Sequence, residues 1–174
     1  MSCQAALIGA LLLTLGSSSS PAPLASPEYA LKAAFIYNFA KFTTWPERSD
    51  RMITLCILGR DPFGAAIDSL DGKEIGNSKL SVRRLRSGGE ATQACQIVFV
   101  SESEVDNYLD RIGNLREASG VLTISEKEGS ARQGIMIELT TEDKKIGFEF
   151  NRDAARLNNV QISSKLLRIA RKVY

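Results

Sequence analysis

Residues 53–58 read ITLCIL and residues 96–100 read QIVFV, and these two apolar runs decide the fold. Continuous runs of about four to eight apolar residues are typical of strands that are buried on both faces. Such strands occur in parallel sheets, because the connections between parallel strands cover both faces with helices. A third run of this kind, VLTI, occupies residues 121–124. The sequence therefore predicts an α/β domain with a mostly parallel sheet.

The segments between these runs predict the helices that cover the sheet. Residues 62–70 and residues 101–114 have the pattern of helices, and residues 79–85 have the pattern of a more exposed strand. Strands that alternate with helices in this order form a doubly wound sheet, which has helices on both faces.

Residues 28–44 predict a helix that ends at Trp45 and Pro46, because a residue before proline avoids the helical conformation. At about 100° per residue the helix has two apolar sides. Large side chains form one side and smaller ones most of the other: Leu31, Phe35, Phe39, Phe42 and Trp45, against Ala30, Ala33, Ile36, Tyr37 and Ala40. We expect the helix to be wedged inside its own domain; the alternative is that the aromatic side contacts a second copy in a homodimer.

The C-terminal part changes character. Apolar and other residues alternate over residues 135–139 and again over residues 146–150, with the polar segment TTEDKK between them, which predicts an antiparallel hairpin. A short helix is expected from Asn151 to Leu157, and a last helix over residues 163–173. The outer face of this last helix is basic, which fits a solvated surface, an acidic partner or anionic lipid headgroups.

The N-terminal segment has the pattern of a secretion signal. The first 27 residues contain no Asp, Glu, Lys or Arg, and residues 5–15 form a mostly apolar run that is too short to span a membrane. We therefore expect residues 1–26 to be a cleaved signal peptide and residues 27–174 to form a single domain.

Export leaves two cysteines, Cys56 and Cys95, because Cys3 lies in the expected signal peptide. An even pair in an oxidising compartment favours a disulfide, and neighbouring strands would bring the two residues within bridging range. Closing a loop of this length is worth roughly 4 kcal/mol. The alternative is two buried free thiols.

The composition excludes several kinds of chemistry. The sequence has no histidine, so Ser-His-Asp and Cys-His catalysis, histidine zinc sites and histidine pH switches are excluded. Its net charge of +2 gives no argument for nucleic acid. No group of residues indicates catalysis, a cofactor or a metal, so we do not expect an enzyme.

One turn offers a weak ligand-binding signal. Gly59, Arg60 and Asp61 open the sequence GRDPFG directly after the first predicted strand, at the end where open α/β sheets bind ligands. A structural role is favoured, in which Gly59 makes the bend and Pro62 begins the next helix.

Four segments together resemble the YfiR-like family of bacterial periplasmic proteins: AAFIYNFAKFTTWP (33–46), LCILGRDPFG (55–64), VLTISE (121–126) and IGFEFNRDAARLNNVQISSKLLRIARKV (146–173). The resemblance runs from about Glu28 to Val173. It implies a periplasmic regulator that restrains an inner-membrane diguanylate cyclase and so controls cyclic di-GMP signalling and biofilm formation. Release would follow from an outer-membrane lipoprotein that sequesters the regulator, or from reducing conditions.

The resemblance also assigns residues. The family disulfide corresponds to Cys56 and Cys95. The surface that contacts the partner corresponds to the hairpin and the residues after it: Phe148, Glu149, Phe150, Asn151 and Leu157. Because related proteins bind small aromatic molecules, the alternative function is a single-domain periplasmic receptor for an aromatic solute.

The chain departs from the family pattern where it enters the hairpin. A Gly-Gly-Met-Ile run is usual there, whereas this chain has Gln133, Gly134, Ile135 and Met136. Any function that needs the backbone freedom of two glycines is therefore in question. A second disulfide found in some members has no cysteines here.

Overall fold

The computed structural model describes residues 26–45, 51–86, 94–114 and 120–174. The expected signal peptide lies almost wholly outside the described residues and stays a prediction. Within the described ranges, no helix has the length and apolar character that crossing a membrane would require.

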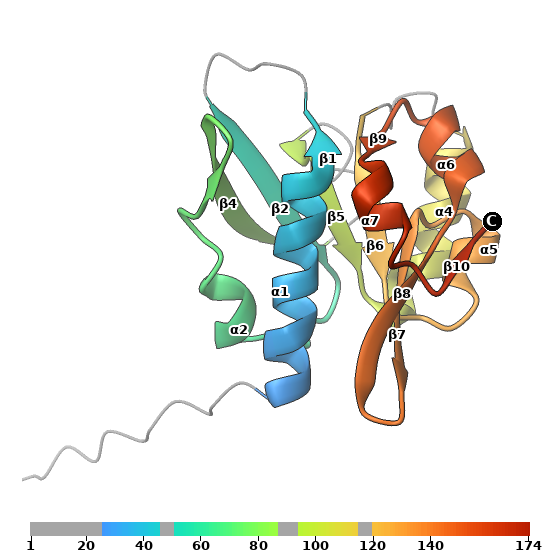
Figure 1. Cartoon of the computed structure of the whole chain (residues 1–174), viewed down its shortest axis with the longest axis horizontal. Coiled ribbons are helices and arrows are strands. Elements are labelled where there is room, and N and C mark those ends of the chain that lie inside the picture. The colour runs from blue at the N-terminus through green and yellow to red at the C-terminus, as the bar shows by residue number, and fades with distance from the viewer. Residues whose placement is uncertain (1–25, 46–50, 87–93, 115–119) are drawn as a thin grey trace, which may run out of the picture.

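An eight-stranded sheet forms the centre of the domain, in the order β10-β8-β7-β6-β5-β2-β4-β3 (Figure 1). Its strands are β2 (Met52–Leu58), β3 (Glu74–Ile75), β4 (Ser78–Leu85), β5 (Ile97–Val100), β6 (Leu122–Ser125), β7 (Ile137–Glu142), β8 (Lys145–Phe150) and β10 (Lys172–Val173). The five strands from β4 to β7 in this order pair in parallel, which confirms the predicted sheet.

The antiparallel hairpin near the C-terminus is also confirmed. Strands β7 and β8 pair from Ile137 with Phe150 to Glu142 with Lys145. Asp143 and Lys144 connect them, both with positive φ, as a tight two-residue hairpin turn requires. The strands therefore extend further into the polar segment than the alternation of apolar residues indicates.

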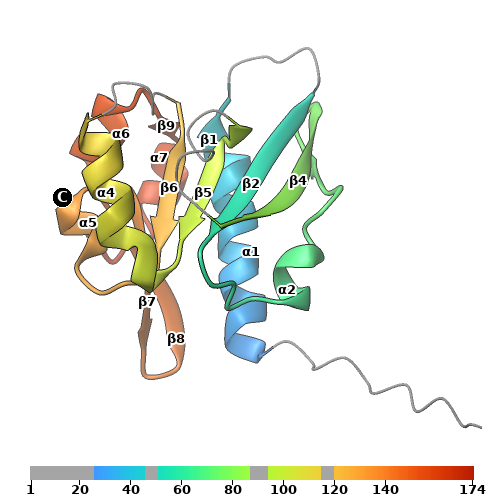
Figure 2. The same ribbon diagram turned by 180° about the vertical axis from the view of Figure 1, so that it is seen from behind.

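Helices cover both faces of the sheet, as predicted. They are α1 (Pro27–Phe42), α2 (Ala65–Asp68), the 3-10 turn η2 (Glu102–Glu104), α4 (Val105–Asn114), α5 (Ser130–Gln133), α6 (Arg152–Leu157) and α7 (Ser164–Leu167). Helices α1 and α7 lie in front of the sheet in Figure 1, and α4 lies on the opposite face, which Figure 2 presents. A separate two-stranded sheet pairs β1 (Thr43–Thr44) with β9 (Gln161–Ile162) and ties the end of α1 to the C-terminal segment.

Helix α1 is wedged inside its own domain. It buries Ala33, Ile36, Phe39 and Ala40 against the sheet. The Phe39 ring contacts the Phe148 ring of β8 with centroids 5.0 Å apart, so residues from the two predicted sides share the buried face. The homodimer that was the alternative for the aromatic side stays a prediction.

The prediction of a long last helix is wrong. Helix α7 is a single turn over Ser164–Leu167, and the chain then extends into β10, which pairs in parallel with β8. The amide of Arg171 donates to the carbonyl of Phe148 (2.8 Å), and the amide of Tyr174 donates to that of Phe150 (2.8 Å). An open strand edge offers unpaired backbone groups, and here these outweigh the helical pattern of the side chains.

Two other helices differ from their predicted bounds. The segment 62–70 forms only α2, because Asp61 and Pro62 belong to a turn that precedes it. The segment 101–114 begins as the 3-10 turn η2 and becomes α-helical at Val105.

Candidate functional site

The sheet has a switch point between β2 and β5. Strand β2 pairs with β4 along one edge and with β5 along the other. After β2 the chain continues to β4 on one side, and after β5 it continues to β6 on the other side, so the connections leave the carboxyl ends of β2 and β5 in opposite directions. Open α/β sheets bind ligands in the crevice at such a point. Gly59, Arg60 and Asp61 follow β2 there, and Ser101 and Glu102 follow β5. The fold therefore brings the predicted ligand residues to the edge where ligands bind.

A crevice of about 520 Å³ lies at this edge. Tyr29 of α1, Arg60, Asp61, Ser101 and Glu126 line it. A second hollow of about 620 Å³ shares some of these residues and continues toward the hairpin. Its lining is strongly acidic, with one lysine among seven glutamates: Lys32, and Glu28, Glu102, Glu126, Glu128, Glu138, Glu142 and Glu149. The described residues contain no group of three or more acidic or cysteine side chains placed to hold a metal ion.

The GRDPFG turn has a structural role at two of its residues. Gly59 has φ +85°, and a Cβ at that position would collide with the side chains of Ser101 and Glu104. The Asp61 carboxylate accepts from the amides of Phe63 (2.7 Å) and Gly64 (3.3 Å). It also pairs with Arg84 of β4 (2.7 Å).

Arg60 is the exposed member of the three predicted ligand residues. Arg60 and Asp61 both line the crevice, and Gly59 and Asp61 build the turn that carries Arg60. The ligand-binding role of these residues stays a prediction. In that prediction Arg60, the exposed residue of the three, is the one that would contact the ligand directly.

Lys32 is the buried centre of an ion cluster beside the crevice. The residue is 5 % exposed, and its Nζ contacts Glu28 Oε1 (2.7 Å) and Glu126 Oε2 (2.5 Å). Its ammonium also lies 4.9 Å from the centre of the Tyr29 ring, and the Tyr29 hydroxyl donates to Glu126 Oε1 (3.3 Å). The cluster fixes the first turns of α1 to the segment that follows β6.

The carboxylates determine the charge state of this cluster. Burial lowers the pKa of Lys32, but its hydrogen bonds to Glu126 and Glu28 raise it more, and the net shift is upward. The hydrogen bond from Lys32 lowers the pKa of Glu28. Burial, together with the neighbouring Glu126 carboxylate, raises the pKa of Tyr29. The lysine therefore stays charged and anchors the helix rather than acting as a base.

Sequence reasoning missed Lys32 and Glu126. The spacing of Glu28 and Lys32 is that of an ordinary exposed helix pair, which gives no sign of burial. Glu126 is 94 residues further along the chain, so its contact with Lys32 exists only in the folded domain.

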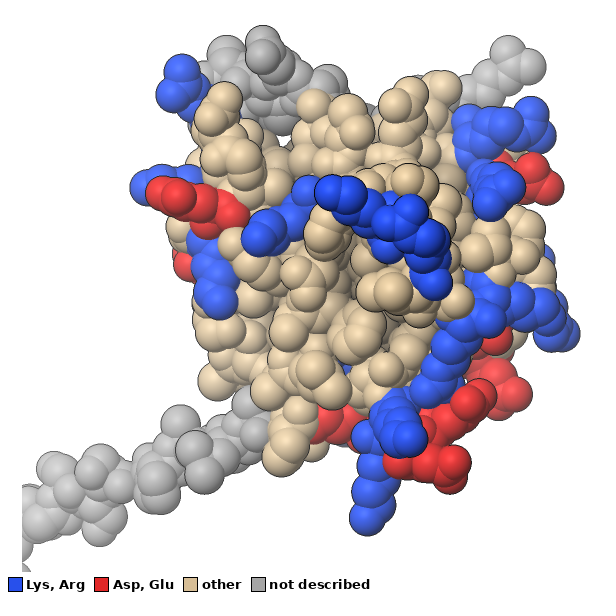
Figure 3. Space-filling view, in the orientation of Figure 1, with Lys and Arg blue, Asp and Glu red and all other residues tan. Residues whose placement is uncertain are grey.

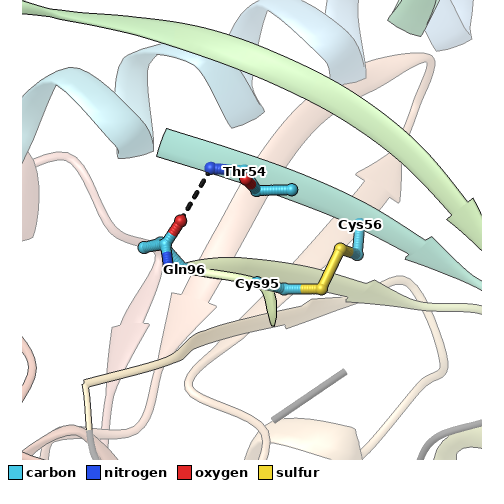
Figure 4. The surroundings of a disulfide bond; sticks show 4 residues. All are labelled: Thr54, Cys56, Cys95 and Gln96. Carbon is cyan, nitrogen blue, oxygen red and sulfur yellow. Dashed lines mark hydrogen bonds between the residues drawn. A yellow bond between two sulfur atoms is a disulfide. The ribbon is translucent and has the colours of Figure 1, made fainter. Parts of the chain in front are cut away.

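The predicted disulfide between Cys56 and Cys95 is present, with the Cα atoms 5.9 Å apart (Figure 4). Both cysteines are buried. Next to the bridge, the Thr54 amide donates to Gln96 Oε1 (2.8 Å) and the Gln96 amide donates to the Thr54 carbonyl (3.0 Å). The bridge therefore joins β2 to the residues that enter β5, at the centre of the sheet.

The residues predicted to contact a partner are distributed between the core and the surface. Phe148 is 1 % and Phe150 3 % exposed, so both pack inside the domain in this conformation. Glu149 accepts a hydrogen bond from the Tyr174 hydroxyl (2.5 Å). Asn151 caps α6 by accepting from the Ala154 amide (2.7 Å). The partner-binding role of the set stays a prediction.

Leu157 is the one of these five predicted residues that is largely in solvent, at 74 % exposed. It ends α6, whose buried side consists of Ala154 and Ala155. Phe148 and Phe150 belong to the same core cluster as Ala154 and Ala155, the buried side of α6.

The altered entry to the hairpin keeps its backbone geometry with one glycine. Gly134 has φ +125°, a conformation that a residue with a side chain rarely adopts, whereas Gln133 is helical within α5. The Glu138 carboxylate holds the same loop by accepting from the amides of Gly129 (3.0 Å) and Ala131 (2.9 Å). Only one of the two positions therefore needs glycine.

The fold is thus a doubly wound α/β domain with a crevice at the switch point of its sheet. The chain belongs to the YfiR/HmsC-like family, whose model matches residues 29–171. No curated protein matches the sequence. Among solved structures, the chain is similar to a conserved domain protein from Vibrio cholerae O1 biovar El Tor strain N16961, with 12 % identity and a TM-score of 0.53. The similarity covers 86 % of this chain and 60 % of that one, and at this identity it concerns the fold alone.

Replacing both Cys56 and Cys95 with alanine is expected to lower the free energy of unfolding by about 4 kcal/mol, because the bridge no longer restricts the unfolded chain. Urea denaturation followed by circular dichroism measures the loss. A thiol reductant should destabilise the wild type to a similar extent and leave the double variant unchanged. Equal stability of the variant and the oxidised wild type would contradict the prediction.

Lys32→Met is expected to lower the free energy of unfolding by about 2–3 kcal/mol at pH 7, because Glu126 loses its cation in a mostly buried site. The raised pKa of Lys32 means that its contribution is present below the ordinary value of 10.5 and is lost as the pH rises through the raised pKa. The lowered pKa of Glu28 means that its contribution is present above 4.5 and is lost as the pH falls through the lowered pKa.

The difference between wild type and Lys32→Met should therefore be largest near neutral pH and decrease toward both extremes. Denaturation curves measured across this range test the expectation. Lys41→Met is the matched control, because Lys41 is an exposed lysine of the same helix. A loss at Lys32 as small as the loss at Lys41 would show that the cluster does not anchor α1.

Proposed function

We propose that this chain is a periplasmic regulator that restrains an inner-membrane diguanylate cyclase by contacting the periplasmic region of that enzyme. The observation that carries the proposal is its membership of the YfiR/HmsC-like family over residues 29–171. Cyclic di-GMP output and biofilm formation would then follow the state of the regulator. The chain itself would bind and not catalyse.

Contact with the cyclase centres on Leu157 in this proposal. Leu157 projects from the end of α6, and the Asn151 cap and the hydrogen bond from the Val160 amide to the Ala155 carbonyl (2.9 Å) hold both ends of this short helix. A largely exposed leucine on a rigid helix end suits a small apolar pocket on a partner. An outer-membrane lipoprotein that covers the same residues would release the cyclase.

Reducing conditions act on the same regulator through the buried bridge. Because Cys56 and Cys95 are both buried, a reductant reaches the sulfur atoms when the centre of the sheet opens. Once reduced, the domain loses roughly 4 kcal/mol, a large share of a typical total stability. Restraint of the cyclase would then decrease because less of the regulator is folded.

Leu157→Asp is expected to abolish most of the restraint while leaving the fold intact. A charge in an apolar contact weakens binding to the partner, whereas a substitution at an exposed position changes the stability of the domain little. Cyclic di-GMP measured in cells that express the regulator with the membrane cyclase encoded nearest to its gene tests this. Asn107→Asp, which adds the same charge at an exposed position of α4, is the matched control. If the Leu157→Asp variant restrained the cyclase as fully as the wild type, the proposed contact through Leu157 would be contradicted.

A second candidate function is a periplasmic receptor for a small aromatic solute, and the crevice at the switch point favours it. The Tyr29 ring borders the crevice and contacts the buried Phe63 ring edge-on, with centroids 5.4 Å apart. Arg60, which also lines the crevice, would bind an anionic group of the solute. The crevice therefore offers one ring and one cation to an aromatic solute, together with three acidic residues, Asp61, Glu102 and Glu126.

Calorimetric titration with aromatic amino acids and aromatic carboxylates tests the receptor. The expected result is saturable heat that Arg60→Ala reduces and Arg83→Ala, a control on the exposed part of β4, leaves unchanged. No saturable heat at millimolar ligand would contradict this candidate and leave the cyclase proposal untouched.

A further inference from the structure

The outer side of α1 is an exposed helix surface with almost no charge. Leu31 is 45 % and Phe42 38 % exposed, and the eleven-residue interval between them puts both on one stripe of the helix. Ala34, Asn38 and Lys41 are the other exposed residues of this side. An outer helix surface normally carries mixed charges, so this surface differs from ordinary solvated helices.

Helix α7 extends this surface and adds positive charge to it. The Ser163 amide donates to the Phe42 carbonyl (2.8 Å), so α7 begins directly beside the end of α1. The exposed residues of α7 and of the two positions after it are Ser164, Lys165, Arg168 and Ile169, the last of them 66 % exposed. Neither Lys165 nor Arg168 has an ion pair with another residue in the part of the chain that the structure describes.

We group these exposed residues under the name α1–α7 face: Leu31, Lys41, Phe42, Lys165, Arg168 and Ile169. Figure 1 presents both helices on the same side of the sheet. In Figure 3, which has the same orientation, Lys and Arg side chains cross the middle of this side, and acidic side chains lie only toward its rim. The face therefore combines protruding apolar groups with a band of positive charge.

We propose that the α1–α7 face docks onto the anionic surface of a phospholipid bilayer. Lysine and arginine side chains near such a surface are attracted to lipid phosphates, and exposed leucine, isoleucine and phenylalanine side chains enter the interface between headgroups and acyl chains. Three basic residues and three apolar residues give weak and reversible binding, and no helix needs to cross the membrane.

The charge of the face argues against a second copy as its occupant. A two-fold dimer places the same patch against itself, so Lys165 and Arg168 would approach their own copies with no acid to neutralise them. An acidic protein surface would also satisfy the charge, and the vesicle experiment below distinguishes it from a bilayer. A flat, deformable and negatively charged surface fits the observations best.

Docking by this face goes beyond the proposed function. If the cyclase is the partner, docking would concentrate the regulator in the layer of the periplasm where the periplasmic region of the cyclase lies. Leu157, on α6, is not part of the face and would remain available to that partner. Vesicle binding needs no cyclase, so it can succeed or fail independently of the proposed restraint.

Co-sedimentation of the mature protein with vesicles tests the proposal. Vesicles of equimolar phosphatidylcholine and phosphatidylglycerol should bind the protein, vesicles of phosphatidylcholine alone should bind it much less, and added salt should weaken binding. K165Q/R168Q should lower partitioning onto the anionic vesicles about tenfold or more. Ile169→Ser should lower it severalfold without removing its salt dependence.

The matched control is K79Q/R83Q, which also removes one lysine and one arginine. Arg83 of β4 pairs in register with Cys56 of β2, whose side chain enters the core on the face opposite α1. Lys79 lies four residues before Arg83 on β4 and therefore on the same face of the sheet. The control should bind like the wild type, and circular dichroism should confirm that all variants are folded.

Three outcomes would overturn the proposal. The first is wild-type protein that binds anionic and neutral vesicles equally. The second is K165Q/R168Q and K79Q/R83Q losing the same amount of binding, because non-specific charge would then explain it. The third is absence of vesicle binding by a wild type whose complex with an acidic protein is lost in K165Q/R168Q, which would assign the face to a protein partner.

Discussion

Strand β2 pairs along both of its edges and is covered on both of its faces. It pairs in parallel with β4 over seven residues and with β5 over four, and Leu55, Cys56 and Ile57 are fully buried. Side chains that alternate to one face enter the core under α1, and those on the other face enter the core that contains the disulfide. Both halves of the domain are therefore built on this strand.

The functional features of the domain follow from that position. The chain turns sharply at the carboxyl end of β2, through a glycine that no residue with a side chain could replace without a collision. Residues of this turn line the crevice, and Tyr29 and Glu126, which belong to the Lys32 cluster, line it as well. The disulfide lies at the other end of β5. The proposed ligand recognition and the proposed redox sensitivity would thus depend on the same pair of strands.

Both proposed contact surfaces include residues of the C-terminal segment, and the sequence pattern indicated its basic side chains but not their position beside α1. The residues from 163 onward have helical periodicity, yet most of them form a single turn and then a strand beside β8. This change puts Ile169 and the nearby basic side chains beside α1 instead of along the back of a long helix. The hairpin aromatics that resemble a contact motif in sequence are core residues, and Leu157 is exposed only because α6 ends there.

The sequence by itself determined the parallel strands, the hairpin and the pairing of Cys56 with Cys95, because continuous apolar runs, strict alternation and two remaining cysteines are local or countable signals. The similarity of its sequence to the YfiR/HmsC-like family identified the family to which the chain belongs. Only the tertiary structure decided which contacts join distant residues: Lys32 with Glu126, β10 with β8, and α1 with α7. The physical reason is that buried ion pairs and strand-edge pairing draw their energy from partners that the chain brings together only on folding.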